Sequence, residues 1–175
     1  MVRQVSERRS GNALRLLAIC GIIGPILYTI VVFTLGVLRP GYCHRAQFLS
    51  ELGEAGAPNA IIMNTAGFLL LGILLIAFAL GLHRGINEGK GSKIGPALIA
   101  VHGAGYVAVS FFPCDPGCVP VSFSGVMHAW ISMIMMGVGI IIAPFFIAQR
   151  LKNDPRWKKY RLYTLATGVV LAVFG

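Results

Sequence analysis

Residues 16–38 decide the fold, and they read LLAICGIIGPILYTIVVFTLGVL. This run of 23 residues carries no charged side chain. The hydrocarbon core of a bilayer is about 30 Å thick, so a helix of about 20 apolar residues spans it. Further apolar runs follow at residues 60–82, 94–112, 125–148 and 162–175. The last of them has 14 residues, which is short for a complete span.

These runs have the character of membrane helices. Strands of a membrane β-barrel alternate polar and apolar side chains over about ten residues, and none of the runs alternates in this way. We therefore predict an all-α fold, a polytopic transmembrane helix bundle with about five spans. Residues 1–175 form a single transmembrane domain in this prediction, with connecting loops at 39–59 and 113–124.

The composition of the whole chain agrees with a membrane location. Hydrophobic residues make up 56% of the sequence and charged residues 12%, whereas soluble domains carry about 25% charged residues. This composition excludes an ordinary soluble domain. It also excludes an intrinsically disordered chain, which would need low hydrophobicity and high net charge.

The positive charges are concentrated in alternate connecting segments, which lie on one side of the predicted bundle. The net charge is +9. All but two of the 15 Lys and Arg residues fall in the N-terminal arm and in the loops after the second and fourth runs: Arg3, Arg8, Arg9, Arg15, Arg84, Lys90, Lys93, Arg150, Lys152, Arg156, Lys158, Lys159 and Arg161. The positive-inside rule places these segments in the cytoplasm. We therefore expect a multi-pass protein of the cell membrane with a cytoplasmic N-terminus, loops 39–59 and 113–124 outside, and no nucleic-acid partner.

Polar residues of different chemistry gather on the predicted outer side. Glu51, Asp115 and His128 are the candidate catalytic residues, because a carboxylate and an imidazole in a partly dry site can act as a general base. The candidate ligand-binding residues around them are Ser50, Asn59, Asn64, His102 and Tyr106. The alternative interpretation is a polar network that only fixes the positions of the loops.

His102 is the most deeply placed ionisable residue of the predicted spans. Ionisable residues inside a membrane are costly and are candidates for function. Tyr106 and Ser110 follow at helical spacing on the same face, and Ala100, Ala104 and Ala108 form a small-residue face beside it. The alternative role for His102 is a hydrogen bond between helices that serves packing.

The cysteines indicate a disulfide in the second outer loop. Cys114 and Cys118 are separated by the turn Asp-Pro-Gly, and the outer side of a membrane is oxidising. Cys43, in the other outer loop, is an alternative partner, and Cys20 is expected to be an inert buried thiol. A zinc site is chemically conceivable here, but no tight ligand pair supports it. We predict no metal and no cofactor.

The outer-loop motifs resemble those of one family. The stretches Pro40-Gly41-Tyr42, Ser50-Glu51-Leu52-Gly53 and 56–60, then the stretch 112–118 with the later His128, resemble the two signatures of the DUF998 family of prokaryotic integral membrane proteins. Members of that family have no known function and typically have about six spans. The resemblance therefore implies a missing sixth helix. A more distant similarity links the Ser-Glu-Leu-Gly…Pro pattern to the FRAG1/DRAM/Sfk1 proteins, some of which are tied to lipid remodelling.

These observations lead to one leading hypothesis of function and two alternatives. We expect the protein to bind or process a lipid or small amphiphile in a cavity between the second, third and fourth spans, beneath the two outer loops. The alternatives are a non-catalytic accessory or scaffold subunit and a thiol–disulfide role of the CDPGC loop. Membrane lipids are the expected partners, with another membrane protein or a second copy of the chain as alternatives. Whether the protein is an enzyme is left open.

Overall fold

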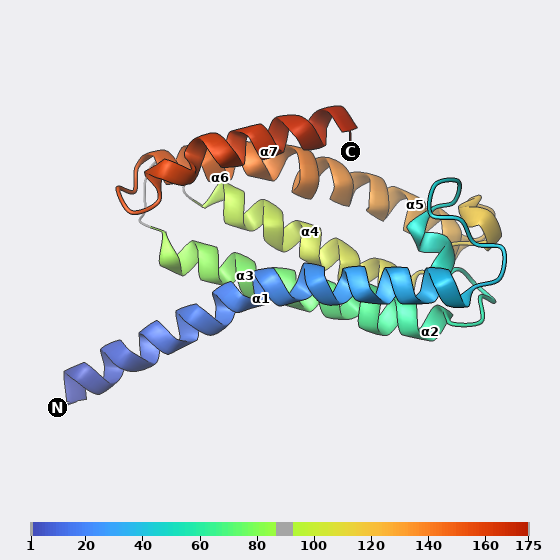
Figure 1. Ribbon diagram of the computed structural model, residues 1–175, viewed down its shortest axis with the longest axis horizontal. Helices are drawn as coiled ribbons and strands as arrows, with labels where there is room; N and C mark the ends of the chain where they lie inside the picture. Colours follow the sequence, from blue (N-terminus) through green and yellow to red (C-terminus); the bar gives the residue numbers. More distant parts are fainter. Residues whose placement is uncertain (1, 87–92, 175) are drawn as a thin grey trace.

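The computed structural model describes residues 2–86 and 93–174, and the described chain is helical without strands. Lys90 and Gly175 lie outside the described residues, as do the side chains of Arg3, Arg8 and Arg9. The long helices lie side by side as one elongated bundle (Figure 1). The predicted all-α fold is confirmed.

Long, nearly continuous helical rods form the body of the bundle. The first is α1 (Val2–Leu38), and the second consists of α2 (Ala60–Ile62), the π-helical stretch η2 (Met63–Leu69) and α3 (Leu70–Gly85). The third is α4 (Ile94–Phe111). The fourth consists of α5 (Phe123–Met135), the π-helical stretch η4 (Met136–Ile142) and α6 (Ala143–Lys152), and α7 (Arg161–Phe174) follows it. Short 3₁₀ turns are η1 (Leu49–Gly53), η3 (Pro116–Cys118) and η5 (Lys158–Tyr160).

Four of these rods are long and apolar enough to cross a membrane. They span Gly11–Leu38, Ala60–Gly85, Ile94–Phe111 and Phe123–Lys152. Their bounds overlap the predicted runs, but the first begins earlier and the fourth ends later, because helical geometry continues past the apolar stretch into basic residues. The fifth helix, α7, has 14 residues, so a fifth span stays a prediction.

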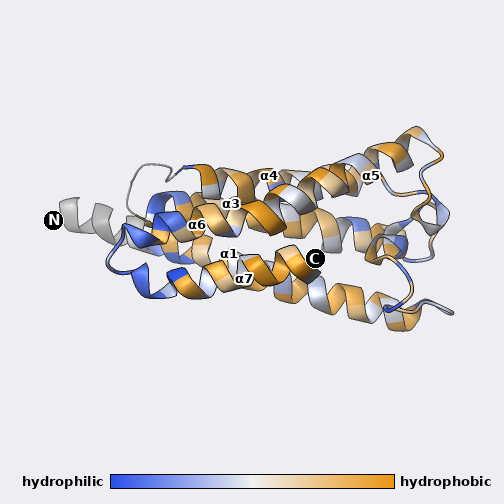
Figure 2. Cartoon of the chain, turned by 90° about the horizontal axis from the view of Figure 1, so that it is seen from above, coloured by the Kyte–Doolittle hydropathy of each residue, from blue (hydrophilic) through white to orange (hydrophobic). Residues whose placement is uncertain are grey.

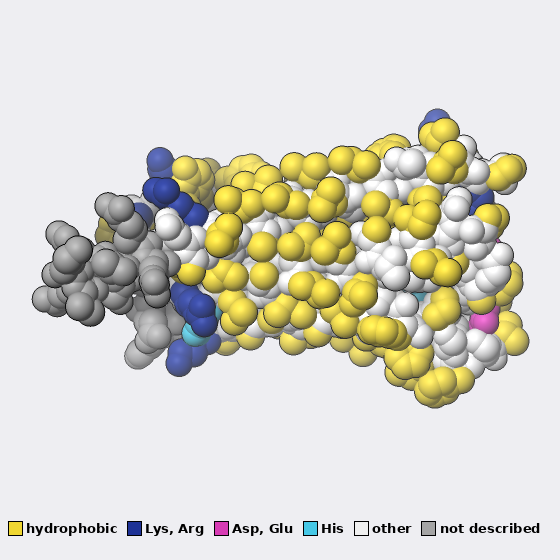
Figure 3. Space-filling view, turned by 90° about the horizontal axis from the view of Figure 1, so that it is seen from below, with side chains coloured by type: hydrophobic (Ala, Val, Ile, Leu, Met, Phe, Trp, Pro, Cys, Tyr) yellow, Lys and Arg dark blue, Asp and Glu magenta, His cyan; other side chains and the backbone are white. Residues whose placement is uncertain are grey.

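The two ends of the bundle differ in chemistry. We call the end that carries loops 39–59 and 113–124 the disulfide end, and the end that carries Arg84, Lys93 and the 152–161 segment the basic end. Figure 2 shows strongly hydrophilic segments at the basic end and apolar helices between the two ends. Figure 3 shows the same division on one face, with a broad apolar belt between the charged ends.

Helix α3 packs against both α1 and α4, and α6 packs against α4 and α7. Helices α3 and α4 approach closely at Gly72 and Gly103, where a Cβ on either glycine would lie 2.5 or 2.7 Å from the other's carbonyl oxygen. This glycine pair is a small-residue contact that the sequence analysis did not name. Ala104, part of the alanine repeat singled out above, is exposed.

Candidate functional site

The candidate site lies at the disulfide end, where loops 39–59 and 113–124 cover the ends of the helices (Figure 1). Beneath the loops is an apolar core that includes Leu52, Met63, Phe68 and Val109. We predicted a cavity between the second, third and fourth spans at this place. This cavity stays a prediction; of the two loops, the first contributes the buried Leu52 to the core.

One ion pair ties the end of α1 to both loops of the disulfide end. Glu54 is only 7% exposed. One of its carboxylate oxygens pairs with the Arg39 guanidinium at 2.6 Å, and the other accepts the backbone N–H of Gly117 at 2.7 Å. Arg39 also donates to the carbonyl oxygen of Glu51. Sequence reasoning missed this pair, although two opposite charges in loops with few charges were the available signal.

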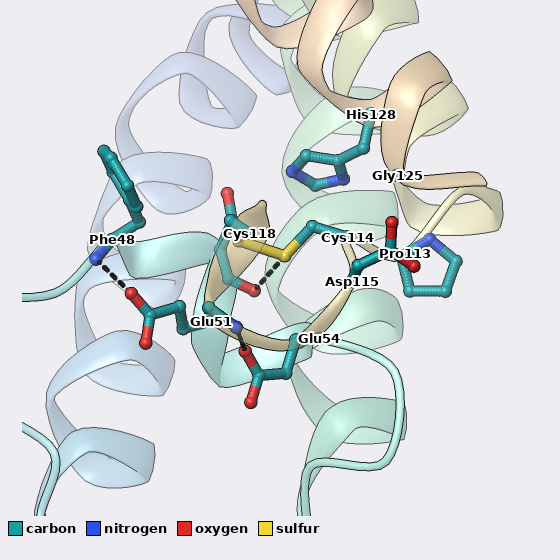
Figure 4. Close-up of a disulfide and its surroundings, with 12 residues drawn as sticks. Phe48, Glu51, Glu54, Pro113, Cys114, Asp115, Cys118, Gly125 and His128 are labelled. Atoms are coloured by element: carbon teal, nitrogen blue, oxygen red, sulfur yellow. Dashed lines mark hydrogen bonds between the residues drawn. A yellow bond between two sulfur atoms is a disulfide. The ribbon is translucent and has the colours of Figure 1, made fainter. Parts of the chain in front are cut away.

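The predicted disulfide between Cys114 and Cys118 is present (Figure 4). Gly117, within the closed turn, adopts a φ of +68°, a conformation that favours glycine. The carbonyl oxygen of Cys114 accepts the N–H of Ala55 at 2.8 Å, which ties the second loop to the first. Cys43 is exposed and Cys20 half-buried, and both are free thiols.

Glu51 is occupied by its own loop. Its carboxylate accepts the N–H of Phe48 at 3.0 Å and the side-chain amide of Gln47 at 2.6 Å. Both bonds organise the start of the η1 turn, which positions the buried Leu52. The neighbouring candidate Ser50 contributes its carbonyl oxygen, 3.5 Å from the sulfur of Cys114. The contacts of Glu51 are those of a residue that shapes a loop.

Asp115 holds the start of α5. One carboxylate oxygen accepts the N–H groups of both Val121 and Ser122 at 2.8 Å. These backbone hydrogen bonds favour the ionised form, so they lower the pKa of Asp115 below its ordinary value. Gly125 leaves room for this carboxylate, since a Cβ there would overlap it. Figure 4 draws Asp115 and Glu51 on opposite sides of the disulfide.

Acidification should loosen the start of α5. Because the folded pKa of Asp115 is lowered, its stabilising effect is fully present above the ordinary pKa of 3.8 and is lost as the pH falls through the lower folded value. Hydrogen exchange of the Val121 and Ser122 amides, measured against pH in detergent micelles, should accelerate several-fold on acidification beyond the intrinsic pH dependence. In Asp115→Asn, which cannot ionise, the extra acceleration should disappear; its persistence there would contradict the assignment.

His128 is the candidate whose chemistry stays open. Its side chain is 4% exposed and packs against Phe68, with ring centroids 6.3 Å apart. Nδ1 lies 2.7 Å from the carbonyl oxygen of Phe112. Because a carbonyl oxygen only accepts, Nδ1 carries the proton, and Nε2 of the neutral ring is an acceptor. This buried Nε2 has no hydrogen-bond partner.

Asn64 has a second buried acceptor without a partner. Its side-chain amide donates to the carbonyl oxygen of Gly53 at 2.9 Å, while the buried Oδ1 has no partner. Asn64 lies one turn before Phe68 on the η2 stretch, and Phe68 contacts His128. Of the four predicted neighbours, His128 contacts Phe68 and Asn64 bonds to Gly53 of the first loop, whereas Glu51 and Asp115 bond to their own loops.

His102 makes the cross-helix bond that was its alternative role. Its Nδ1 lies 2.9 Å from the carbonyl oxygen of Met135, the residue before the π-helical stretch η4, where the helical hydrogen-bond ladder is rearranged. The ring fits against Gly139, where a Cβ would overlap it, and packs on Tyr106 at 5.1 Å. These contacts connect α4 to the fourth rod.

An aromatic cluster links these residues through the core. Tyr106 packs against Tyr28 and Phe68, each at 6.0 Å between centroids, and Tyr28 lies 6.3 Å from Phe68. Sequence reasoning named Tyr106 but missed Tyr28, which shares one face of α1 with the buried Val32 and Leu35. The last candidate, Asn59, precedes α2, and its carbonyl accepts the N–H groups of Ile62 and Met63. Within residues 2–86 and 93–174, no three His, Cys, Asp or Glu side chains form a metal-binding group.

Comparison with known proteins decides the family. The family model "Protein of unknown function (DUF998)" matches residues 22–175, most of the chain. The chain belongs to the DUF998 family. No curated protein and no solved structure matches it, so the similarity to FRAG1/DRAM/Sfk1 proteins stays a prediction. Family membership and the apolar helices together make this a membrane protein.

Proposed function

We propose that this DUF998 protein binds a membrane amphiphile at its disulfide end, through a headgroup that donates hydrogen bonds to His128 and Asn64. The observation that carries the proposal is the buried, unpartnered Nε2 of His128. We also propose that the basic end faces the cytoplasm. The described cations Arg15, Arg84 and Lys93 lie in the segments that the positive-inside rule assigns to that side.

The cost of an unsatisfied acceptor supports this reading. A buried polar atom without a partner costs about 1–3 kcal/mol, and such atoms are rare enough in folded proteins to need an explanation. In this proposal, hydroxyl or ammonium groups of a lipid headgroup donate to Nε2 of His128 and to Oδ1 of Asn64. In this proposal Glu51 and Asp115 act by positioning the loops, because their carboxylates bond to loop backbone.

The test is retention of lipid by purified protein in mild detergent, read by native mass spectrometry. Wild type should carry a lipid that His128→Phe, which keeps an aromatic ring against Phe68, does not retain. The matched control is His44→Phe, the same change at an exposed histidine of the first outer loop. Thermal unfolding of each variant would exclude loss of fold. Equal retention of lipid by all three proteins, or no lipid bound to wild type, would contradict the proposal.

A second candidate is an accessory subunit. The observation that favours it is a group of exposed apolar side chains on the second outer loop and the start of α5, where Val121 is 83% and Phe123 75% exposed. A neighbouring membrane protein would cover them. A stable partner in a mild-detergent pull-down that Val121→Ser/Phe123→Ser abolishes would favour this function. The thiol–disulfide alternative instead requires that alkylation in cells finds Cys114 partly reduced.

A further inference from the structure

A cavity of about 580 Å³ opens at the basic end, far from the site described above. It lies between α1, α3, α6 and α7, and its lining includes Leu14, Phe78 and Ile147. Small-molecule sites in proteins commonly measure about 300–1,000 Å³. This cavity is therefore large enough for a substantial part of a lipid molecule.

Two glycines of α3 have different surroundings at this cavity. Gly81 and Gly85, one turn apart on α3, both line the cavity. A Cβ on Gly81 would meet Leu17 of α1 at 2.9 Å, so Gly81 allows the two helices to approach. A Cβ on Gly85 would have no atom within 4 Å, so this glycine faces open space. A larger side chain at Gly85 can therefore fill the cavity without a clash of its Cβ atom.

The residues around the cavity are those of a membrane interface. Arg15 and Arg156 line it together with Trp157, Tyr160 and Tyr163. Trp and Tyr concentrate where lipid headgroups meet hydrocarbon. Arg156 is anchored rather than free, since its guanidinium pairs with Asp154 at 2.8 Å and donates to the carbonyl oxygen of Gly85 at 3.1 Å. Its side chain is nevertheless 61% exposed, while that of Asp154 is fully buried.

Charge selects the kind of lipid. The described cations of this end include Arg15, Arg84, Lys93, Lys152, Arg156, Lys158, Lys159 and Arg161. Among the described side chains there, Asp154 is the acid, and it is buried against Arg156. Basic pockets between membrane helices bind the headgroups of anionic lipids. A zwitterionic headgroup would place its own positive charge among these cations.

We propose that this cavity is a binding site for an anionic phospholipid. An acyl chain occupies the apolar space beside Phe78 and Gly85, and the phosphate lies against Arg15 and the exposed side of Arg156. The site is separate from the His128 site and does not depend on the function proposed there. It requires only that the basic end lies at a membrane surface.

The experiment compares two lipids with identical acyl chains. Delipidated protein in mild detergent is titrated with dioleoylphosphatidylglycerol or dioleoylphosphatidylcholine, and bound lipid is counted by native mass spectrometry. Wild type should retain the anionic lipid preferentially. Gly85→Leu, which fills the cavity, should lose most of it, and the matched control Gly11→Leu, on the same side but outside the cavity with open space at its Cβ, should bind like wild type.

A second variant keeps the proposal testable if Gly85→Leu does not fold. Arg15 is exposed, so Arg15→Gln should fold normally, and it should weaken binding of the anionic lipid about fivefold, since one cation near a membrane surface contributes about 1 kcal/mol. Equal binding of the two lipids by wild type would overturn the charge argument. Undiminished binding by Gly85→Leu would overturn the site, and a lipid-free dimer would assign the cavity to a second copy of the chain.

Discussion

Glu54→Gln should lower the free energy of unfolding by about 3 kcal/mol, because it leaves the Arg39 guanidinium in a largely buried position without its counter-charge. The side chains of Arg39 and Glu54 are 20% and 9% exposed, so water replaces the lost partner only in part. Glutamine has the shape of glutamate, which limits the change to charge. Equilibrium unfolding in mixed detergent micelles would measure the loss.

Arg39→Gln and the double variant complete the test. If the pair acts as a unit, the double variant should be more stable than the sum of the single changes implies, because removing both charges leaves neither of them uncompensated. Limited proteolysis should also show both loops of the disulfide end opening in Glu54→Gln, since Glu54 holds Gly117 of loop 113–124. Wild-type stability in Glu54→Gln, or strict additivity in the double variant, would contradict the role of this pair.

The sequence predicts the helical bundle because its strongest signal is local. Each span is a long, predominantly apolar run, and the cost of exposing backbone polar groups to lipid favours a helix for such a run. The disulfide is equally predictable from the sequence, because Cys114 and Cys118 are four residues apart across a turn. The separation of cations toward one end also follows directly from their positions along the chain.

The candidate site was less predictable because its bonds join distant residues. Glu54 reaches Arg39 across 15 positions and Gly117 across 63. The same polar residues are compatible with a ligand-binding site or with a network that fixes the loops. Only their contacts in the structure distinguish these two interpretations. They assign Glu51 and Asp115 to loop backbone, whereas Nε2 of His128 is left without a partner.

The cavity at the basic end was missed for a related reason. Its space depends on which glycines face a gap, and Gly81 and Gly85 differ in their surroundings although they share a helix. The aromatic residues of the 157–163 segment were visible in the sequence. They line a common cavity with residues of α1 and α3 because α7 packs along α6.

The packing of α3 on α4 predicts a second large change in stability. Gly103→Leu should destabilise the bundle by at least about 2 kcal/mol, since overpacking costs about 1–3 kcal/mol or more and leucine recovers about 1 kcal/mol of helix propensity. The cost lies at the upper end because the added Cβ would meet the Gly72 carbonyl oxygen at 2.7 Å, and backbone cannot rotate away as a side chain can.

The neighbouring residue provides the control for this prediction. Ala104→Leu makes a similar change on the exposed side of α4, so it should change stability by less than about 0.5 kcal/mol. Equilibrium unfolding of the two variants in the same micelles compares them directly. Because Ala104 belongs to the four-residue alanine repeat and Gly103 does not, a larger loss in Ala104→Leu would mean that the repeat, rather than the glycine pair, holds the helices together.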